Sequence, residues 1–483
     1  MKLLKYLFIS SALLITTSCG NSWLDLEPST SIDTETSIKI LTDVEFTLNG
    51  IYSTMQSSDA YSGRLIYYGD VTGDDMQAVS STKRVANYYR FNFTKDDGPT
   101  SHWSYLYSII QNCNLIIMNI DKLVIDEEDE EYRDDLKGEA LAIRGLALFD
   151  LTRIFGYPYT KDNGASLGVP IIEGLSTISS KPARNTVAQC YEKVIDDLTR
   201  SIDLLSGSFK KGKINKWAAM VLLSRVYLYK GENANALKMA EDAIAGAEKK
   251  GYALWTNEEY PTAWGNDASK SNPGEVLFEI VNLTTDSPGK ESMGYLNSKD
   301  GYDDMCITCS FYQFLKEDPK DVRLKLLSFD KKYYAYVFKY QPQQEENIQD
   351  ANIPLIRLSE AYLIAAEAAV KEGNNAAAVK YLDPIVRRAN PDKTVQGETI
   401  TLGRVLDERR KELVAEGHRM YDVIRNGMSI HRIEVEDAKL TKTKHDTKYM
   451  DYDWDFYMIV LPIPKKEMDA NPNMEQNPQY GGR

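Results

Sequence analysis

The chain of 483 residues contains few of the residues on which most enzyme chemistry depends. It has only five cysteines and four histidines, and it lacks Gly-x-Ser-x-Gly, His-Glu-x-x-His and any glycine-rich loop that would cradle a phosphate. The usual signatures of nucleophilic, zinc and nucleotide chemistry are therefore missing. A glycosidase needs only two carboxylates, and the 71 acidic residues leave that class open without singling out a pair.

Positive charge is also scarce. Lysine and arginine number 57 against 71 acidic residues, so the formal net charge is −14. This charge repels phosphate backbones and argues against general nucleic-acid binding, although it leaves room for a local basic patch. The cysteines are too few to staple a chain of this length, whereas 43% hydrophobic residues suffice for a large globular core.

A long apolar run is found only at the start of the chain. Lys2 and Lys5 precede an apolar stretch at residues 6–15, which is too short to cross about 30 Å of hydrocarbon. Thr-Thr-Ser then leads into Cys19, which resembles the lipobox of bacterial lipoproteins. We predict a signal peptide over residues 1–18 and an acylated Cys19 that anchors the mature chain without spanning the membrane. An ordinary secretory signal that ends near a cysteine is the alternative.

The rest of the chain has the periodicity of paired helices, which predicts a mainly α fold. Between residues 214 and 247, large, small and aromatic residues follow the spacing of a tetratricopeptide unit, and Gly231 and Asn233 supply the turn between its helices. Each pair alone would expose an apolar face, which stacking against the next pair buries. We predict four tetratricopeptide-like helix pairs in a right-handed α-superhelix, near residues 37–123, 131–205, 214–250 and 354–390.

Two long insertions interrupt these helices, at residues 57–101 and 251–353. They are rich in Gly, Asp, Ser, Asn and Tyr, and they contain short β-like runs at residues 275–281 and 333–340. Long irregular segments inside a compact domain are usually functional. The ligand-binding surface is therefore expected on these two insertions.

Tyrosine outnumbers phenylalanine 31 to 13, and several tyrosines and tryptophans lie in the insertions. An exposed ring offers an apolar face to a sugar and a phenol adds a hydrogen bond, whereas packing against the core is the ordinary role of a single such ring. The predicted stacking residues are Tyr67, Tyr68, Trp264, Tyr295 and Tyr302, and the predicted hydroxyl or charge partners are Asp74 and Arg84.

No catalytic residue, cofactor or metal site is predicted. A structural calcium held by some of Asp70, Asp74, Asp75, Asp300, Asp303 and Asp304 is conceivable, but no motif supports it. Cys306 and Cys309 have the spacing of a redox or zinc motif, yet no second cysteine pair or nearby histidine completes a zinc site. A local disulfide and two free thiols both remain open.

Three glutamates recur every four residues near the end of the chain. Glu408, Glu412 and Glu416 lie among Arg409, Arg410 and Lys411, on one face of a predicted helix. This spacing favours ion pairs that tie the final helices onto the repeat stack. Catalysis is not needed to explain it.

Six ordered motifs extend over nearly the whole chain. They are Cys19 followed by WLDLEP at 23–28, SYLYSIIQNCNLIIMNID at 104–121, GEALAIRGLALFDLTRIFGYP at 138–158, RLSEAYLIAAEAAVKEGN at 357–374, DERRKELVAEGHRMYDVIRNG at 407–427 and LPIPKKEMDANPNMEQNPQY at 461–480. Together they resemble the SusD/RagB-type nutrient-uptake lipoproteins of Bacteroidota outer membranes. Gln479 stands where the family usually has glycine, which is a small departure.

The resemblance implies one SusD-like domain over residues 19–483, with a C-terminal family segment at 401–483. It implies a lipid-anchored protein of the outer membrane that faces the cell exterior and has no enzymatic activity. Such a protein captures oligosaccharide and delivers it to a partner, a SusC-like TonB-dependent transporter. Peptide binding on the same architecture is the main alternative, and a surface glycosidase or a structural adaptor is a weaker one. Binding residues vary with substrate in this family, so only the two insertions are implied as the binding region.

Overall fold

The structure is a computed structural model that describes residues 37–99, 101–177, 179–265, 274–343 and 347–481. The predicted signal peptide and Cys19 lie outside the described residues. Helices dominate and the strands are short, which confirms the prediction of a mainly α fold. None of the described helices is both long and apolar enough to cross a membrane.

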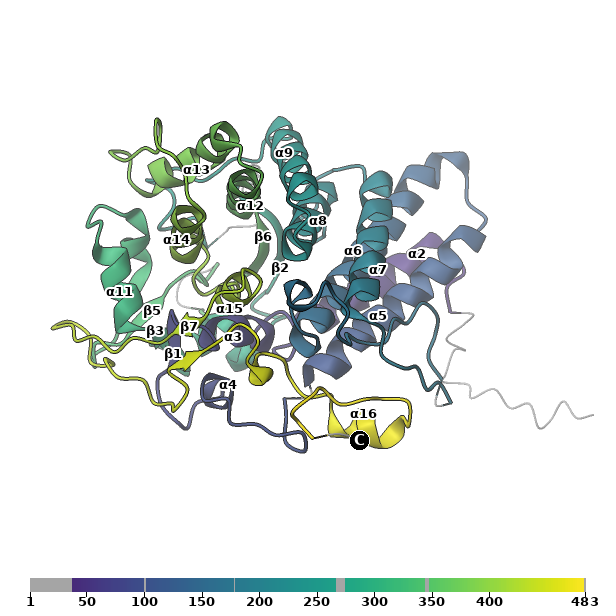
Figure 1. The fold of residues 1–483 in the computed structure, drawn as a ribbon. Helices are drawn as coiled ribbons and strands as arrows, with labels where there is room; N and C mark the ends of the chain where they lie inside the picture. Colours follow the sequence, from purple (N-terminus) through teal and green to yellow (C-terminus); the bar gives the residue numbers. More distant parts are fainter. Residues whose placement is uncertain (1–36, 100, 178, 266–273, 344–346, 482–483) are drawn as a thin grey trace, which may run out of the picture.

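Long helices pack against one another in chain order, each one contacting the next, across the upper and right-hand parts of Figure 1. They are α2 (Leu41–Met55), α5 (Ser101–Asn119), α6 (Glu130–Phe155), α7 (Val187–Leu204), α8 (Lys216–Lys230), α9 (Asn233–Lys249), α12 (Leu358–Lys371) and α13 (Asn375–Ala389). The short 3-10 helices η3 (Ile120–Lys122), η4 (Glu127–Asp129) and η5 (Tyr159–Lys161) lie between them. These helices fall in the four predicted ranges, while the tetratricopeptide-like character and the handedness of the stack stay predictions.

Local sequence signals set the ends of these helices. Thr186 caps α7 by accepting a hydrogen bond from the Gln189 N–H at 3.2 Å, while the Gln189 side chain accepts one from the Thr186 N–H at 2.9 Å. The Asn215 side chain caps α8 in the same way, and Gly231 ends α8 at a φ of 85° that favours glycine. Helix α9 contains small residues that let it lie close to its neighbours. They are Ala236, Ala240 and Ala243, which are fully buried.

The two insertions form short elements beside the helical stack. The first contains α3 (Arg64–Val71), β1 (Met76–Ala78) and α4 (Ala86–Tyr89). The second contains β2 (Val276–Ile280), η6 (Gly289–Glu291), α10 (Met293–Leu296), β3 (Met305–Ile307), α11 (Cys309–Lys316), η7 (Val322–Leu326), β4 (Leu327–Phe329) and β5 (Ala335–Val337), and β6 (Ile353–Arg357) leads into α12. Strand β2 lies within the predicted β-like run at residues 275–281, and β5 lies within the one at 333–340. Both predicted runs are therefore confirmed.

Antiparallel pairing of β1 with β3 joins the two insertions to each other. Met76 lies opposite Ile307 in this two-stranded sheet, and the Val79 N–H extends the ladder by donating to the Asp304 carbonyl at 3.1 Å. Strand β2 pairs in turn with β6, and β4 with β5. Residues that follow β1 are therefore placed beside residues that precede β3, although more than 200 positions separate them in the chain.

Cys306 and Cys309 are both buried and are not bonded to each other. Cys306 lies on β3 and Cys309 is the first residue of α11. Burial raises the pKa of the Cys306 thiol to about 12, so it is protonated at neutral pH. The sequence left a local disulfide and two free thiols open, and in the structure both cysteines are free thiols.

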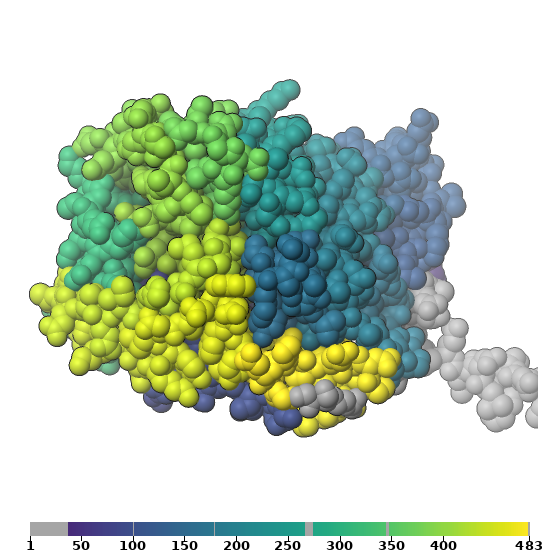
Figure 2. Space-filling model, in the orientation of Figure 1, coloured from purple at the N-terminus to yellow at the C-terminus, as the bar shows by residue number. Residues whose placement is uncertain are grey.

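The C-terminal part of the chain covers the lower face of the molecule (Figure 2). It contains α14 (Leu402–Glu412), α15 (Arg419–Ile424), β7 (Ile430–His431), β8 (Asp451–Tyr452), η8 (Tyr457–Ile459) and α16 (Lys465–Ala470). The Tyr68 hydroxyl on α3 donates to the Ile459 carbonyl at 2.6 Å, which fastens this segment to the first insertion.

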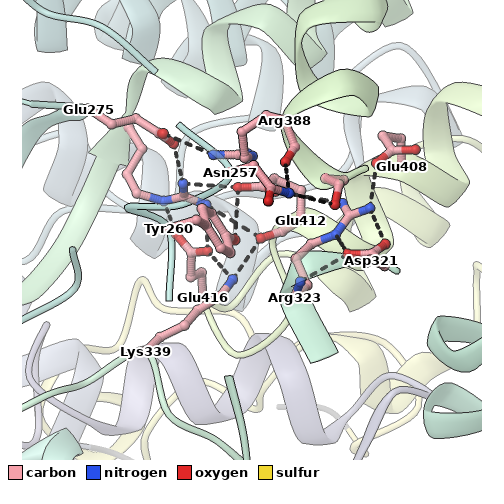
Figure 3. A network of polar contacts seen from close by, with 12 residues as sticks. Asn257, Tyr260, Glu275, Asp321, Arg323, Lys339, Arg388, Glu408, Glu412 and Glu416 are labelled. Carbon is pink, nitrogen blue, oxygen red and sulfur yellow. Dashed lines mark hydrogen bonds and ion pairs between the residues drawn. The ribbon is translucent and has the colours of Figure 1, made fainter. Parts of the chain in front are cut away.

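A buried network of ion pairs holds α14 against the second insertion and α13 (Figure 3). Glu412 lies 3.1 Å from Arg357, at the end of β6, and 2.7 Å from Arg388 on α13. Glu408 lies 2.7 Å from Arg323 on η7, and Glu416 lies 2.7 Å from Arg357. These contacts confirm the predicted ion pairing of the three glutamates, but the predicted single helix face is wrong for Glu416, which lies in the turn after α14 ends at Glu412. Burial alone would raise the pKa of Glu412, but Arg388, Arg357 and Arg323 outweigh it and lower the pKa to about 2.

Candidate ligand-binding site

Four of the seven predicted binding residues gather where the two insertions meet. Tyr67 comes from α3, Arg84 from the loop after β1, Tyr295 from α10, and Tyr302 from the turn before β3. The Arg84 guanidinium lies 4.0 Å from the centre of the Tyr302 ring, and the Tyr295 and Tyr302 rings meet edge to face at 5.0 Å. Tyr295 and Tyr302 are half-buried, so part of each ring stays in contact with solvent. We call Arg84, Tyr295 and Tyr302, with the side chains that contact them, the insertion cluster.

Acidic side chains surround Arg84 in this cluster. Its Nη2 lies 3.2 Å from Oε1 of Glu291 and its Nη1 lies 3.5 Å from Oδ1 of Asp304. The Lys83 ammonium donates to the Tyr302 carbonyl at 2.6 Å and pairs with Asp303. About 35% of the Arg84 side chain is exposed, so its remaining donors are open to a ligand.

The turn between α10 and β3 brings Tyr295 and Tyr302 together. The Tyr302 N–H donates to the Tyr295 carbonyl at 2.9 Å, and the Asp304 N–H donates to the Leu296 carbonyl at 3.0 Å. Gly301 is required here, because a Cβ at this position would clash with the Tyr295 backbone. Contacts within this one turn therefore hold the two rings together.

Polar groups without well-formed hydrogen bonds to the described residues lie beneath Arg84. They are both carboxylate oxygens of Asp304, whose side chain is fully buried, and the hydroxyl of Tyr67. Burial raises the pKa of Asp304, against the opposing effect of Arg84 and Lys83. Burial and then Asp304 raise the pKa of Tyr67 well above its usual value. Rings, a forked cation and carboxylate acceptors are the groups that recognise the faces and hydroxyls of a saccharide.

Three predicted stacking rings offer no open face, and the expectation of an exposed platform fails for them. Tyr67, Tyr68 and Trp264 are 1%, 0% and 2% exposed. Tyr68 packs edge to face against Tyr88 at 5.7 Å within the main core. Trp264 lies over the buried ion pairs, 4.7 Å from the Arg357 guanidinium. Tyrosine and tryptophan in an irregular segment still pack inward wherever the segment covers a core.

Asp74 is likewise occupied by the protein itself. Its carboxylate accepts hydrogen bonds from Arg419 at 2.6 and 2.9 Å, and the side chain is buried. Burial would raise the pKa of Asp74, but Arg419 and Arg410 outweigh that effect and hold it below the usual value. Asp74 thus joins the first insertion to the C-terminal segment and lies outside the insertion cluster. Within the described ranges, no group of three or more His, Cys, Asp or Glu side chains is arranged to hold a metal ion.

Sequence reasoning missed four charged members of the insertion cluster, namely Lys83, Glu291, Asp303 and Asp304. Asp303 and Asp304 were noticed only as calcium candidates. Lys83 is next to Arg84 in the sequence, and Asp304 directly precedes β3. A prediction that β1 pairs with β3 would have placed these two residues near each other. Nothing in the sequence distinguishes Glu291 from other exposed acids.

Comparison with known proteins agrees with this architecture. Residues 328–480 match the model of the SusD family, and residues 22–228 match a model described as starch-binding associating with outer membrane. A solved structure described as a putative sugar binding protein, from Bacteroides vulgatus, is 80% identical, covers 92% of this chain and 100% of its own, and has a TM-score of 0.91.

Two further solved structures extend the comparison. A SusD superfamily protein from Bacteroides vulgatus is 39% identical over 92% of this chain and 100% of its own, with a TM-score of 0.84. A laminarin binding SusD-like protein is 21% identical over 92% of this chain and 100% of its own, with a TM-score of 0.70, and so shares the fold. This chain belongs to the SusD family.

Proposed function

We propose that this protein captures oligosaccharide outside the cell and delivers it to a SusC-like TonB-dependent transporter. The insertion cluster carries this proposal, because it places two half-buried rings beside an arginine and several carboxylates at the junction of the two insertions. Relatives described as sugar binding, laminarin binding and starch-binding support a glycan as the ligand class. The protein acts by binding and release, without chemical turnover.

The recognition chemistry follows from the members of the cluster. The Tyr295 and Tyr302 rings contact the C–H face of a sugar, and Arg84 donates to its hydroxyls. Glu291, with a side chain 42% exposed, accepts from a hydroxyl on the same side. A ligand that stacks fully on Tyr302 displaces the Arg84 guanidinium from the ring, which also uncovers Asp304 as an acceptor.

Binding of neutral oligosaccharides measured by titration calorimetry tests the proposal. Loss of one stacked ring removes about 1.5–3 kcal/mol of burial, so Tyr302→Ala is expected to weaken binding by about 10- to 100-fold. Tyr333→Ala is the matched control, because Tyr333 belongs to the same insertion, is 58% exposed and is not among the cluster contacts. Binding that Tyr302→Ala leaves intact contradicts the proposed site. Retention of peptides with no retention of any glycan supports the peptide alternative, and release of shortened glycans reveals a glycosidase.

Attachment to the membrane through an acylated Cys19 is part of the same proposal. The family model describes association with the outer membrane, and the lipobox-like sequence supplies the acceptor cysteine. We expect a Cys19→Ala chain to leave the membrane fraction while it still binds glycan in solution. Sedimentation of the variant with the membranes at the level of the unaltered chain would refute a lipid anchor at this residue.

A further inference from the structure

A pocket of about 430 Å³ lies outside the insertion cluster, between α2, residues 211–213 and the end of β2. Its lining combines the apolar Ile280 and Val281 with polar side chains of α2. The volume falls in the range of pockets that hold small ligands. None of the predicted binding residues lines it.

Hydrogen bonds hold the walls of this pocket in place before any ligand arrives. The Tyr52 hydroxyl donates to Glu139 at 2.7 Å and accepts from the Ile214 N–H at 3.1 Å. At the C-cap of the same helix, the Gln56 amide donates to the carbonyls of Val281 and Asp286, at 3.1 and 2.8 Å. A ligand therefore pays little to order these groups, which favours binding.

Lys213 and Lys211 are the cations that line this pocket, and Lys213 has no carboxylate within 4.0 Å in the part of the chain that the structure describes. The side chain is half-buried, its ammonium lies 4.1 Å from the centre of the Tyr52 ring, and it donates to Oδ1 of Asn49 at 2.5 Å. An ammonium has three donors, so this arrangement leaves donor capacity for a ligand. The neighbouring Lys210 and Lys211 differ, because each has an acidic partner, Asp135 at 3.4 Å and Glu279 at 3.8 Å respectively.

We propose that this pocket binds the carboxylate of a sugar acid, with Lys213 as the group that receives it. The proposal rests on the proposed function in taking a saccharide as the ligand. The apolar lining and the Tyr52 ring suit the C–H face of a pyranose. Lys213 has no ion pair to a described residue, so an anionic group would give its half-buried ammonium a charge-assisted hydrogen bond.

The charge of the ligand can be tested with two oligomers that differ by one methyl group on each carboxyl. Titration calorimetry would compare a short oligogalacturonate with the same oligomer in its methyl-esterified form. We expect the unaltered protein to bind the acid form about 10-fold more tightly, or about 1.4 kcal/mol, and Lys213→Gln to abolish that preference. Lys213→Arg keeps the charge and is expected to keep the preference, which separates charge from a general disturbance of the pocket.

Three results would overturn the inference. They are equal binding of the acid and the ester by the unaltered protein, an unchanged preference in Lys213→Gln, and capture of peptide carboxylates in place of the sugar acid. Failure of the proposed function gives a different pattern, in which neutral glycans are not bound at all or Tyr302→Ala has no effect on them. Because Tyr302 does not line this pocket, Tyr302→Ala should weaken the binding of neutral glycans, while the preference for the acid oligomer over its ester persists.

Discussion

Replacement of Glu412 by glutamine is expected to lower the free energy of unfolding by about 3–5 kcal/mol. Glutamine keeps the shape of the side chain, removes its charge and replaces one acceptor oxygen with an amide donor. Glu412 is fully buried and lies 3.1 Å from Arg357, 2.7 Å from Arg388 and 3.6 Å from Arg323. Without its carboxylate, these buried guanidinium groups lose their shared counter-ion, and breaking a buried ion pair from one side is far more costly than never having formed it.

Urea denaturation followed by circular dichroism measures this loss. The matched control is Asp242→Asn, which removes one partner of the solvent-exposed pair that Lys238 and Asp242 form at 2.8 Å on α9. An exposed pair four residues apart on a helix contributes only about 0.3–0.5 kcal/mol. Equal destabilisation by the two substitutions would show that the network around Glu412 has no special part in stability.

Acid is expected to destabilise the fold through the same carboxylates. The pKa of Glu412 is lowered to about 2, and those of Glu408, Glu416 and Glu367 are lowered as well, because arginines outweigh the effect of burial. A carboxyl whose pKa is depressed by folding contributes stability above its unfolded pKa, near 4.3, and loses it as the pH falls toward its folded value. Glu412 alone accounts for about 3 kcal/mol over this window.

The comparison of two proteins isolates this effect. The free energies of unfolding of the unaltered chain and of Glu412→Gln should differ most above pH 5, and the difference should shrink as the pH approaches 2. The contribution of Asp70 and Glu139 to stability has the opposite pH dependence. Burial raises the pKa values of these two carboxyls, so their contribution falls as the pH rises. Both chains contain them, so they cancel in the difference. A difference that stays constant from pH 7 to pH 2 would contradict the lowered pKa of Glu412.

The helices were predictable because their signals act over a few residues. The Thr186 and Gln189 side chains cap α7 within one turn, and Gly231 ends α8 through its own backbone conformation. The spacing of Glu408, Glu412 and Glu416 likewise predicted ion pairs, although α14 contains only the first two and Glu416 lies in the turn after it. Their partners come from β6, η7 and α13, and the sequence did not identify them.

The binding residues were harder to predict because exposure is not a local property. Tyr67 and Tyr302 are the same residue type in segments of similar composition, yet Tyr67 is buried and Tyr302 is half-buried. The difference arises because α3 packs into the core, while the turn before β3 stays at the surface. Asp74 and Arg84 were both predicted to be polar partners of a ligand. The Asp74 carboxylate instead forms an ion pair with Arg419.

By itself, the sequence determined a mainly helical member of the SusD family with two irregular insertions. Helix periodicity, caps and ordered motifs depend only on residues that are close together in the chain. Only the tertiary structure decided which aromatic rings face solvent, which acids are paired with arginines, and that Lys213 lines a pocket without an ion pair to any described residue. The physical reason is that burial and charge compensation depend on groups brought together from distant parts of the chain, as the pairing of β1 with β3 brings Arg84 to Tyr302.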